Sequence, residues 1–434
     1  MKKIYHTLFL LVITTLALAQ TDAKLLTQLN QEVKDIEPKM IGWRRFFHEH
    51  PELSNREFKT GAKIAEFLRS LGMEVHYPVA KTGVVGLLKG GKPGPVVALR
   101  SDIDGLPITE RNSLPFLSKE KSTLGGIETG VMHACGHDGH MAILMAVAEI
   151  LSKNKSELKG TVKFIFQPAE EGAPVGEEGG AALMIKEGVL ENPKVEVIFG
   201  LHIQSLLPLG TVSYRPEGLM AAVDAFNIKV TGKGAHGATP WDSVDPLVTS
   251  SEILLGLQTI ISRQTELTKA SAVITVGSFH GGIRRNIIPE EANMEGTIRT
   301  FDADMQKKVH EKIKLTATKI AESAGATADV NIMIQYPVTY NDPGFTEKMA
   351  PSLQRAIGKE NVKVISPVTM AEDFSFYQQK VPGFFFFVGA YSPDLKLEKQ
   401  PTHHTADFII DERCMSVGVK SLLTLTLDYM NMKK

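Results

Sequence analysis

Short apolar runs and longer amphipathic stretches alternate along the chain. From residue 22 to 71 the apolar positions recur at helical spacing, with a break at Pro51 and an end at Gly72. Apolar segments bounded by glycine and proline follow, and the run Val96–Leu99 is typical of a strand that is covered on both faces. The pattern predicts helices first and then the strands of a buried sheet.

Between residues 141 and 202, predicted helices and apolar strands take turns. Helices are predicted over 141–151 and 177–190, and buried strands over 161–167 and 195–202. Strands that alternate with helices are joined by right-handed crossovers, which produce a mainly parallel sheet. This part of the chain is therefore predicted to be an α/β domain.

The pattern changes near Ala225. From there to Tyr340 the order of predicted elements is β-α-β-β-α-β, which is the ferredoxin-like plan. The α/β pattern then resumes and ends with a helix from Met415 to Met430. The expected fold class is α/β, with a mainly parallel sheet in a domain formed by residues 22–222 and 338–434, and a ferredoxin-like domain inserted at residues 223–337.

Residues 1–19 predict a secretory signal peptide. A positive start at Met1-Lys2-Lys3 precedes an apolar run and the small-x-small pattern of Ala17-Leu18-Ala19. The alternative is an uncleaved hydrophobic anchor. Elsewhere no apolar run reaches the roughly twenty residues of a membrane span. The mature protein is expected in the periplasm or the medium, and the choice between them stays open.

Composition excludes several partners. The 434 residues carry a formal net charge of −1, with 43% hydrophobic and 22% charged residues. Such a chain is globular and has neither the basic patch of a nucleic-acid-binding protein nor a polybasic membrane patch. Its two cysteines, Cys135 and Cys414, lie in different contexts, so a metal ligand is favoured over a disulfide at Cys135.

The stretch Met132–His140 contains the densest candidate chemistry. It holds three histidines, Cys135, an aspartate and two glycines, and it leads directly into a predicted helix. Thiolate and imidazole suit zinc or another late transition metal. The helix N-terminus is expected to lower the pKa of Cys135 and favour its thiolate. The alternative is a buried structural cysteine beside surface histidines.

Further polar side chains follow the predicted buried strands. Asp102, the pair Glu170-Glu171, and His202 each come at a predicted strand end, the edge where open α/β sheets bind ligands. One glutamate can bind metal while the other acts as general base. Asp102 is better placed to orient a ligand than to bind metal. In the loop pair His403-His404 either residue could be a ligand by composition.

Alternatives exist for these residues taken singly. The glutamate pair could form a solvated acidic loop, and His202 could be a core histidine. Two earlier histidines, His48 and His50, fall in the helical region and are predicted to pack or cap rather than bind metal.

Several of these motifs together carry a resemblance. Residues 132–140, 167–172, 200–202 and 404–408, with the segments RSDIDGLPI, GKGAHGATP, RRNIIPEEANMEGTIRT and AEDFSFY, occur in this order along the chain. In this respect the chain resembles the amidohydrolase branch of the aminoacylase/carboxypeptidase metallopeptidases. That group includes hippurate hydrolases, auxin-amino-acid hydrolases and N-acetyl-diaminopimelate deacetylases.

The resemblance implies a site for two divalent metal ions, with manganese or zinc expected and cobalt or nickel possible. Glu170 takes the general-base position. His404 is preferred to His403 because the family's ligand stands four residues before an aromatic residue, here Phe408. The family usually has a proline two residues after this histidine, where the chain has Ala406. The implied metal ligands are Cys135, His137, Glu171, His202 and His404.

The resemblance also gives the inserted domain a role as lid and dimerisation domain, so a homodimer is expected. His236 would donate to the carbonyl oxygen as it becomes an oxyanion. Asn286 and Arg299 match positions near the substrate, and Glu372-Asp373 matches a motif that lines the pocket.

The expected function is hydrolysis of the amide bond of N-acyl amino acids or short peptides by an exported, metal-dependent amidohydrolase. A metallo-carboxypeptidase or dipeptidase on the same scaffold is the nearest alternative, and a metal-binding protein without turnover is another. A serine hydrolase is disfavoured because the G-x-S-x-G motif is missing from the sequence.

Overall fold

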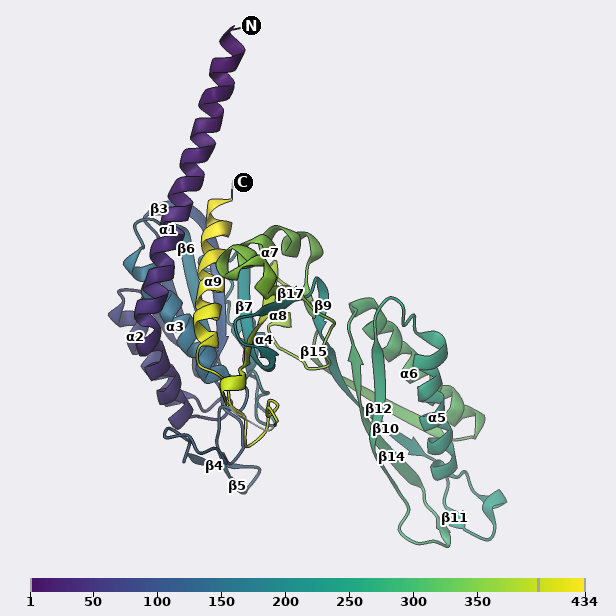
Figure 1. Ribbon diagram of the computed structural model, residues 1–434. Coiled ribbons are helices and arrows are strands. Elements are labelled where there is room, and N and C mark those ends of the chain that lie inside the picture. Colours follow the sequence, from purple (N-terminus) through teal and green to yellow (C-terminus); the bar gives the residue numbers. More distant parts are fainter. Residues whose placement is uncertain (1, 396–398, 433–434) are drawn as a thin grey trace. The chain divides into compact units, whose positions relative to one another are not determined.

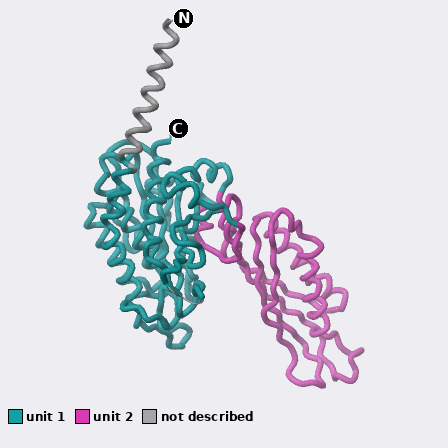
Figure 2. Tube along the Cα trace, viewed as in Figure 1, with its two compact units in different colours: residues 1–214, 342–365, 379–434 teal, residues 215–341, 366–378 magenta. Residues whose placement is uncertain are grey.

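The computed structural model describes residues 2–395 and 399–432, except for the side chains of residues 2–24 and Leu26. It divides into two compact units (Figure 2). Unit 1 comprises Met1–Tyr214, Asp342–Ile365 and Gln379–Lys434, and unit 2 comprises Arg215–Asn341 and Ser366–Gln378. Unit 2 thus starts and ends slightly outside the range 223–337 and also takes in the segment Ser366–Gln378.

Unit 1 is built on an eight-stranded sheet in the order β1-β2-β6-β3-β7-β18-β8-β17. Figure 1 labels β3, β6, β7 and β17 of this sheet. Its four central strands are all parallel. The mainly parallel sheet predicted from the sequence is therefore confirmed. The central strands are β6 (Lys159–Gln167), β3 (Lys92–Asp102), β7 (Val197–Pro208) and β18 (Gly383–Tyr391), and the outer ones are β1 (Glu74–Val79), β2 (Gly83–Lys89), β8 (Val212–Tyr214) and β17 (Val362–Val364).

Helices pack on this sheet and enclose its apolar residues. The helix α3 is buried from His137 to Leu151 because it lies among strands β3 and β7 and helices α1 and α9. Its apolar side chains join those of the strands in one core. The helices of unit 1 are α1 (Lys2–Glu49), α2 (Phe58–Ser70), α3 (His137–Lys153), α4 (Gly180–Lys186), α7 (Pro343–Ile357) and α9 (Cys414–Asn431).

Two details differ from the expected elements. The helix predicted over 177–190 is limited to α4, because Gly188 takes a φ of +82° and the amide of Val189 bonds back to Met184, which ends the helix. The strand predicted to end at His202 continues to Pro208 as β7, since its pairing with β18 extends that far. However, β7 pairs with β3 only up to Gly200, opposite Arg100, so His202 lies two residues past the end of this pairing.

The predicted signal peptide, residues 1–19, falls where side chains are not described, and it stays a prediction. Within the described part of the chain, no helix is long and apolar enough to cross a membrane.

Unit 2 contains the βαββαβ order predicted for the inserted domain. Its four-stranded sheet has the order β12-β14-β10-β15 with antiparallel pairs. Helices α5 and α6 contribute the apolar side chains that cover it. These elements are β10 (Ala222–Thr231), α5 (Pro246–Gln264), β12 (Ala272–Gly281), β14 (Glu291–Thr300), α6 (Ala303–Ser323) and β15 (Thr327–Tyr336).

Short elements complete the two units. In unit 2 they are β9 (Glu217–Met220), β11 (Ala235–His236), β13 (Ile287–Ile288), β16 (Thr339–Asn341) and α8 (Ser375–Gln378). In unit 1 they are the hairpin strands β4 (Lys121–Leu124) and β5 (Ile127–Gly130).

Candidate metal centre

Acidic, thiol and imidazole groups from several segments meet at one edge of the unit 1 sheet. Asp102 ends β3, and the turn after β6 carries the two adjacent glutamates. Cys135 and His137 flank Gly136, whose φ of +94° reverses the chain just before α3. His202 extends from β7, and His403 and His404 come from the loop before α9. All five predicted metal ligands thus lie in unit 1.

The imidazole of His137 is held with one nitrogen turned toward carboxylates. Its Nδ1 lies 2.9 Å from the carbonyl oxygen of Asp104, to which it donates. Its Nε2 is buried and has no hydrogen-bond partner among the described residues. That atom lies 3.8 Å from a carboxylate oxygen of each of three residues: Asp102, Glu170 and Glu171. A buried nitrogen at this distance from three carboxylates fits a metal ligand.

The carboxylates around His137 also favour a cation at this position. Burial disfavours its imidazolium, but the carboxylates of Asp102 and Asp104 outweigh burial and raise the pKa of His137 to about 10. The surroundings thus favour a positive charge at this position, and a divalent cation would supply it after His137 loses its proton.

His202 is held in the same manner. Its Nδ1 lies 2.7 Å from the carbonyl oxygen of Ile203, and its Nε2 lies 3.3 Å from Cys135 Sγ. Burial, together with the neighbouring His140, holds the pKa of His202 well below its usual value. The ring is therefore neutral and presents the lone pair of Nε2 toward the thiol, as a metal-binding histidine does.

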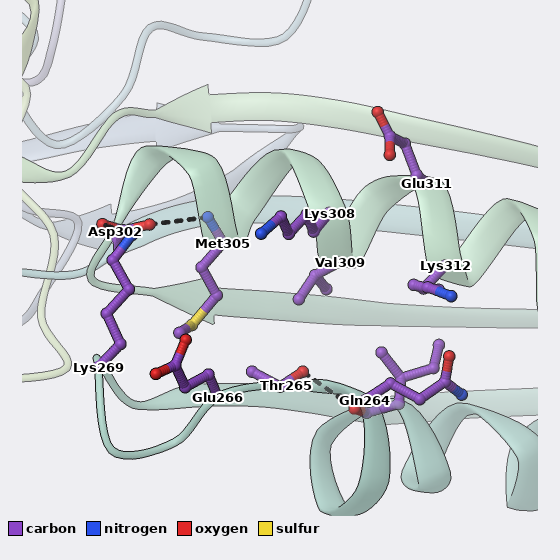
Figure 3. Close-up of a pocket in the computed structure, with 11 residues that line it drawn as sticks. Gln264, Thr265, Glu266, Lys269, Asp302, Met305, Lys308, Val309, Glu311 and Lys312 are labelled. Carbon is purple, nitrogen blue, oxygen red and sulfur yellow. Dashed lines mark hydrogen bonds and ion pairs between the residues drawn. The ribbon is translucent and has the colours of Figure 1, made fainter.

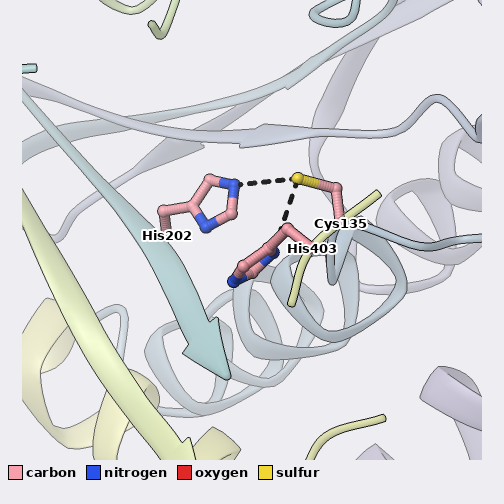
Figure 4. Close-up of side chains that lie close together, drawn as sticks. All are labelled: Cys135, His202 and His403. Atoms are coloured by element: carbon pink, nitrogen blue, oxygen red, sulfur yellow. Dashed lines mark hydrogen bonds between the residues drawn. The ribbon is translucent and has the colours of Figure 1, made fainter. Parts of the chain in front are cut away.

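The two loop histidines differ in the nitrogen that they present. His404 Nε2 lies 3.3 Å from Cys135 Sγ and 3.1 Å from Glu171 Oε1, and its amide donates to the carbonyl of Ala134. His403 and His202 both face the sulfur of Cys135 (Figure 4), and His403 Nδ1 lies 3.7 Å from it. Because His403 Nε2 accepts the Ser205 N–H at 3.2 Å, its neutral ring carries the proton on Nδ1. Of the two, His404 therefore has the geometry better suited to a metal ligand.

The expected effect of the helix N-terminus on Cys135 is wrong for the protein without cations. Burial raises the pKa of the Cys135 thiol well above its usual value, and the carboxylates of Glu171 and Glu170 raise it further. The dipole of α3 is too weak to offset both effects. A thiolate at this position needs a cation beside it, which a bound metal ion provides.

The donor set fits divalent metal ions. Cys135, Glu171 and His404 place one donor atom each within 4.8 Å of one another, and so do His137, Glu170 and Glu171. The two groups overlap at Glu171, so the cluster offers donors for more than one ion. Sulfur, imidazole nitrogen and carboxylate oxygen together suit zinc, and the oxygen donors also suit manganese.

Asp102 is engaged by side chains around the cluster. Its Oδ2 accepts from Arg100 at 2.7 Å, and its Oδ1 lies 2.6 Å from His140 Nδ1. The other nitrogen of His140 accepts the Ile203 N–H at 2.8 Å. Both nitrogens of His140 are thus used, so His140 links Asp102 at the end of β3 to Ile203 within β7 and has no nitrogen left for a metal ion.

Sequence reasoning did not assign roles to Asp104 and His140. His140 could have been noticed because it stands three residues after His137, on the same face of α3. Fewer features of the sequence indicated a role for Asp104. Its Oδ2 accepts the Glu171 N–H at 3.0 Å and the Ser54 hydroxyl at 2.8 Å, and these contacts appear only after folding.

A buried ionic network supports the residue that follows His137. Asp138 Oδ2 lies 2.8 Å from Arg44 Nε and 2.8 Å from His48 Nδ1. His48 Nε2 lies 3.0 Å from Glu110. His48 thus packs in the interior of unit 1, as predicted, and does not join the metal cluster.

The loop with His404 is tied to the segment after Glu110. The Arg111 N–H donates to the carbonyl of Ala406 at 2.9 Å, and Asn112 donates to the carbonyl of Phe408 at 2.8 Å. Arg111 also pairs with Asp407 at 2.6 Å. The loop is therefore held without the proline that the resemblance led us to expect at Ala406.

The predicted substrate residues belong to unit 2. His236 and Asn286 are exposed neighbours, since the Gly237 N–H donates to the Asn286 carbonyl at 2.9 Å. His236 Nδ1 accepts the Ala238 N–H at 3.0 Å, so its neutral ring presents Nε2–H outward. Arg299 lies half-buried on β14 opposite Val223, and Glu372-Asp373 lies in the separate segment of unit 2.

A cavity within unit 2 differs in chemistry from the cluster in unit 1. A cavity of about 150 Å³ lies between the end of α5 and the start of α6 (Figure 3). It contains neither cysteine nor histidine among its lining residues, and its basic and acidic groups balance. These charged residues are Lys269, Lys308, Lys312, Glu266, Asp302 and Glu311. The metal-type donors are thus in unit 1 and not in this cavity.

Comparisons with known proteins agree with this chemistry. Residues 98–428 match the model of peptidase family M20/M25/M40. The chain is 39% identical over 412 residues to thermostable carboxypeptidase 2 of Saccharolobus solfataricus, covering 94% of this chain and 99% of the relative. It is 39% identical over 386 residues to N-acetylcysteine deacetylase of Bacillus subtilis, covering 89% and 95%.

A solved structure extends the likeness to the whole fold. A Bacillus subtilis protein described as a dinuclear metal-binding peptidase of the M20 family superposes with a TM-score of 0.76. The two chains are 35% identical, and the match covers 92% of this chain and 99% of that one.

Replacing Cys135 with serine should weaken divalent-metal binding by at least roughly 10²-fold, because the cluster loses its one sulfur donor. Chelator competition with bound metal measured by mass spectrometry tests this. Cys414→Ser is the matched control, since Cys414 is the other buried cysteine and lies on α9. Unchanged metal affinity in Cys135→Ser would mean that the thiol is structural.

Variants of the two loop histidines should differ in metal affinity in the same assay. His404→Ala should lower metal affinity by roughly 10²-fold or more, whereas His403→Ala should lower it by roughly 10-fold or less, as for a supporting residue. The reason is that His404 turns Nε2 toward both Cys135 and Glu171, whereas His403 faces the sulfur with the nitrogen that carries its proton. The reverse order would make His403 the ligand.

Proposed function

Because the chain belongs to peptidase family M20/M25/M40 and is a metal-dependent hydrolase of amide bonds, we propose that its substrates are N-acyl-L-amino acids. The products are a carboxylate and a free amino acid. The similarity to an N-acetylcysteine deacetylase supports this substrate class. The observation that carries the proposal is the metal-type cluster in which Glu171 stands beside a second carboxylate, Glu170.

The proposed ligands of two divalent cations are Cys135, His137, Glu171, His202 and His404. Bound there, such ions polarise a carbonyl group and make water more acidic. Zn²⁺ is favoured by the thiol and Mn²⁺ by the carboxylates, with Co²⁺ or Ni²⁺ as further candidates.

Glu170 is the proposed general base. Its side chain is buried and lies 3.8 Å from His137 Nε2, inside the cluster. There it would take a proton from the attacking water and then return it to the leaving amine. Pure metal binding does not require this second carboxylate, which argues against a protein without turnover.

The proposed substrate residues come from unit 2. His236 is exposed and turns an N–H outward, so it is suited to donate to the carbonyl oxygen as negative charge develops. Asn286, its neighbour, and Arg299 are proposed to bind the substrate's carbonyl or carboxylate. Asp102 is proposed to orient the cluster through Arg100 and His140.

A homodimer through unit 2 is part of the proposal. Val248 and Leu255 are 57% and 66% exposed, and they stand seven residues apart on α5, which places them on one face of the helix. Exposed apolar side chains that share a face are suited to a partner surface. We also propose export to the periplasm or the medium, on the strength of the signal-peptide pattern in residues 1–19.

A metallo-carboxypeptidase or dipeptidase is the second candidate. It is supported by the 39% identity to a thermostable carboxypeptidase. Both activities cleave an amide bond next to a carboxylate-bearing residue, so they differ in what the acyl side of the substrate must fit.

A substrate panel distinguishes these functions. Metal-stripped protein is expected to release amino acid from N-acetyl or N-benzoyl amino acids only after Mn²⁺, Zn²⁺ or Co²⁺ is added, with slower cleavage of dipeptides. Product amino acid is measured by chromatography. Faster cleavage of peptides than of acyl amino acids would favour the carboxypeptidase, and no cleavage with any metal would favour a binding protein.

Glu170→Gln should lower kcat by at least roughly 10²-fold while metal content stays the same, because the amide cannot accept the proton. Steady-state kinetics and metal analysis on the same preparation check this. Wild-type turnover in the variant would remove Glu170 from the role of base.

A further inference from the structure

The turn that presents the two glutamates contains a strained residue. Ala169 follows β6 and Pro168 and immediately precedes Glu170, with a φ of +53°. A residue with a Cβ adopts this left-handed conformation only at an energetic cost. Ala169 is 2% exposed, so its backbone polar groups depend on protein partners. Some contact must hold this conformation in place.

A buried carboxyl group from another element makes that contact. Glu57 Oε1 accepts the Ala169 N–H at 2.9 Å, and Glu57 Oε2 accepts the Thr82 hydroxyl at 2.6 Å. Glu57 is 0% exposed and immediately precedes α2. Burial and then the carboxylate of Asp104 raise the pKa of Glu57 to about 8. Burying an acidic side chain costs folding free energy, and both carboxyl oxygens of Glu57 accept hydrogen bonds.

The other side of Glu170 is held as well. The Glu171 N–H donates to Asp104 Oδ2 at 3.0 Å. Glu57 and Asp104 therefore accept the N–H groups of the residues directly before and after Glu170. Two acceptors on different segments thus hold the Pro168–Ala169 peptide and the Glu170–Glu171 peptide, one before and one after the Glu170 side chain.

Close packing leaves this turn little freedom. A Cβ at Gly83 would lie 2.7 Å from Pro168 Cδ, and a Cβ at Gly61 would lie 2.3 Å from the Thr82 carbonyl oxygen. The start of α2, the segment Thr82-Gly83 and the turn are thus packed directly against one another. Because Glu57 immediately precedes α2 and accepts the Ala169 N–H, a shift of α2 would also move Ala169.

We propose that Glu57 is a positioning residue for the reaction: by accepting the Ala169 N–H it holds the left-handed turn that aims the Glu170 carboxylate into the metal cluster. The inference rests on the proposed function, in which Glu170 is the base. It assigns no contact between Glu57 and the substrate.

A structural role for Glu57 is the competing explanation. The bond to Thr82 could dock α2 on unit 1, with the bond to Ala169 incidental. The two explanations predict different behaviour when Thr82, Ala169 or the length of the acid is changed.

The test compares kcat, KM, metal content and melting temperature across five forms of the metal-loaded, full-length protein. Glu57→Leu removes the acceptor and should lower kcat by roughly 10- to 100-fold, with KM within about twofold and metal content unchanged, as expected for a misplaced catalytic group. Glu57→Gln keeps an oxygen acceptor and should stay within about threefold of wild type.

Two further variants separate the explanations. Thr82→Val removes only the other partner of Glu57 and should leave kcat near wild type. Adding Ala169→Gly to Glu57→Leu should recover at least part of the lost kcat, because glycine adopts the left-handed conformation without a Cβ penalty. If Glu57→Leu does not fold, Glu57→Asp replaces it, since its shorter side chain keeps the carboxyl group but cannot reach both partners.

The result that would overturn the proposal is a Glu57→Leu protein with wild-type kcat, or an equal loss of kcat in Thr82→Val. If wild-type protein cleaves nothing on the substrate panel, the proposed function fails, and the positioning role is then decided by crystal structures. Those should show Ala169 outside the left-handed region in Glu57→Leu and inside it in wild type. An unchanged φ at Ala169 would refute the role independently of activity.

Discussion

Repulsion among buried acidic groups is the constraint on which the site in unit 1 depends. The outer carboxylates are offset by the protein's own cations: Asp102 is paired with Arg100 at 2.7 Å, and Asp138 with Arg44 at 2.8 Å. The inner groups, Cys135 and Glu171, instead face imidazoles, and the pKa of the thiol is raised well above its usual value. Buried charge needs a compensating charge, and metal ions bound in the cluster would supply it.

The arrangement also explains why the fold must form before the centre can. The candidate ligands come from segments as far apart as Cys135 and His404, and two of them, His137 and His404, are held by backbone carbonyls of other segments. The carbonyl of Asp104 orients His137, and the carbonyl of Ala134 anchors the loop of His404. A carbonyl that bonds one ring nitrogen of a histidine turns the other nitrogen toward the cluster. The backbone at the sheet edge therefore orients the candidate ligands as well as bringing them together.

Periodicity was enough to predict the parallel sheet and the βαββαβ order, because apolar spacing records which faces are buried. It also placed the ligand-type residues at one sheet edge, since strand ends are visible in the sequence. It could not reveal Glu57, which bonds an amide 112 residues away, or the neutral state of His202, which follows from burial. The pKa of Cys135 was misjudged because a local helix dipole was weighed without the distant carboxylates.

Chemistry and substrate choice reside in different units under the proposed function. Unit 1 holds the cluster and Glu170, together with Glu57 and Asp104, which support Glu170. None of these residues is proposed to contact the acyl group. His236, Asn286 and Arg299 belong to unit 2, where the first two are exposed. A change of residues on unit 2 could therefore alter the accepted substrate while leaving the donors of unit 1 unchanged. Such a separation would allow relatives that are equally similar to this chain, a deacetylase and a carboxypeptidase at 39% identity each, to differ in the substrate they accept.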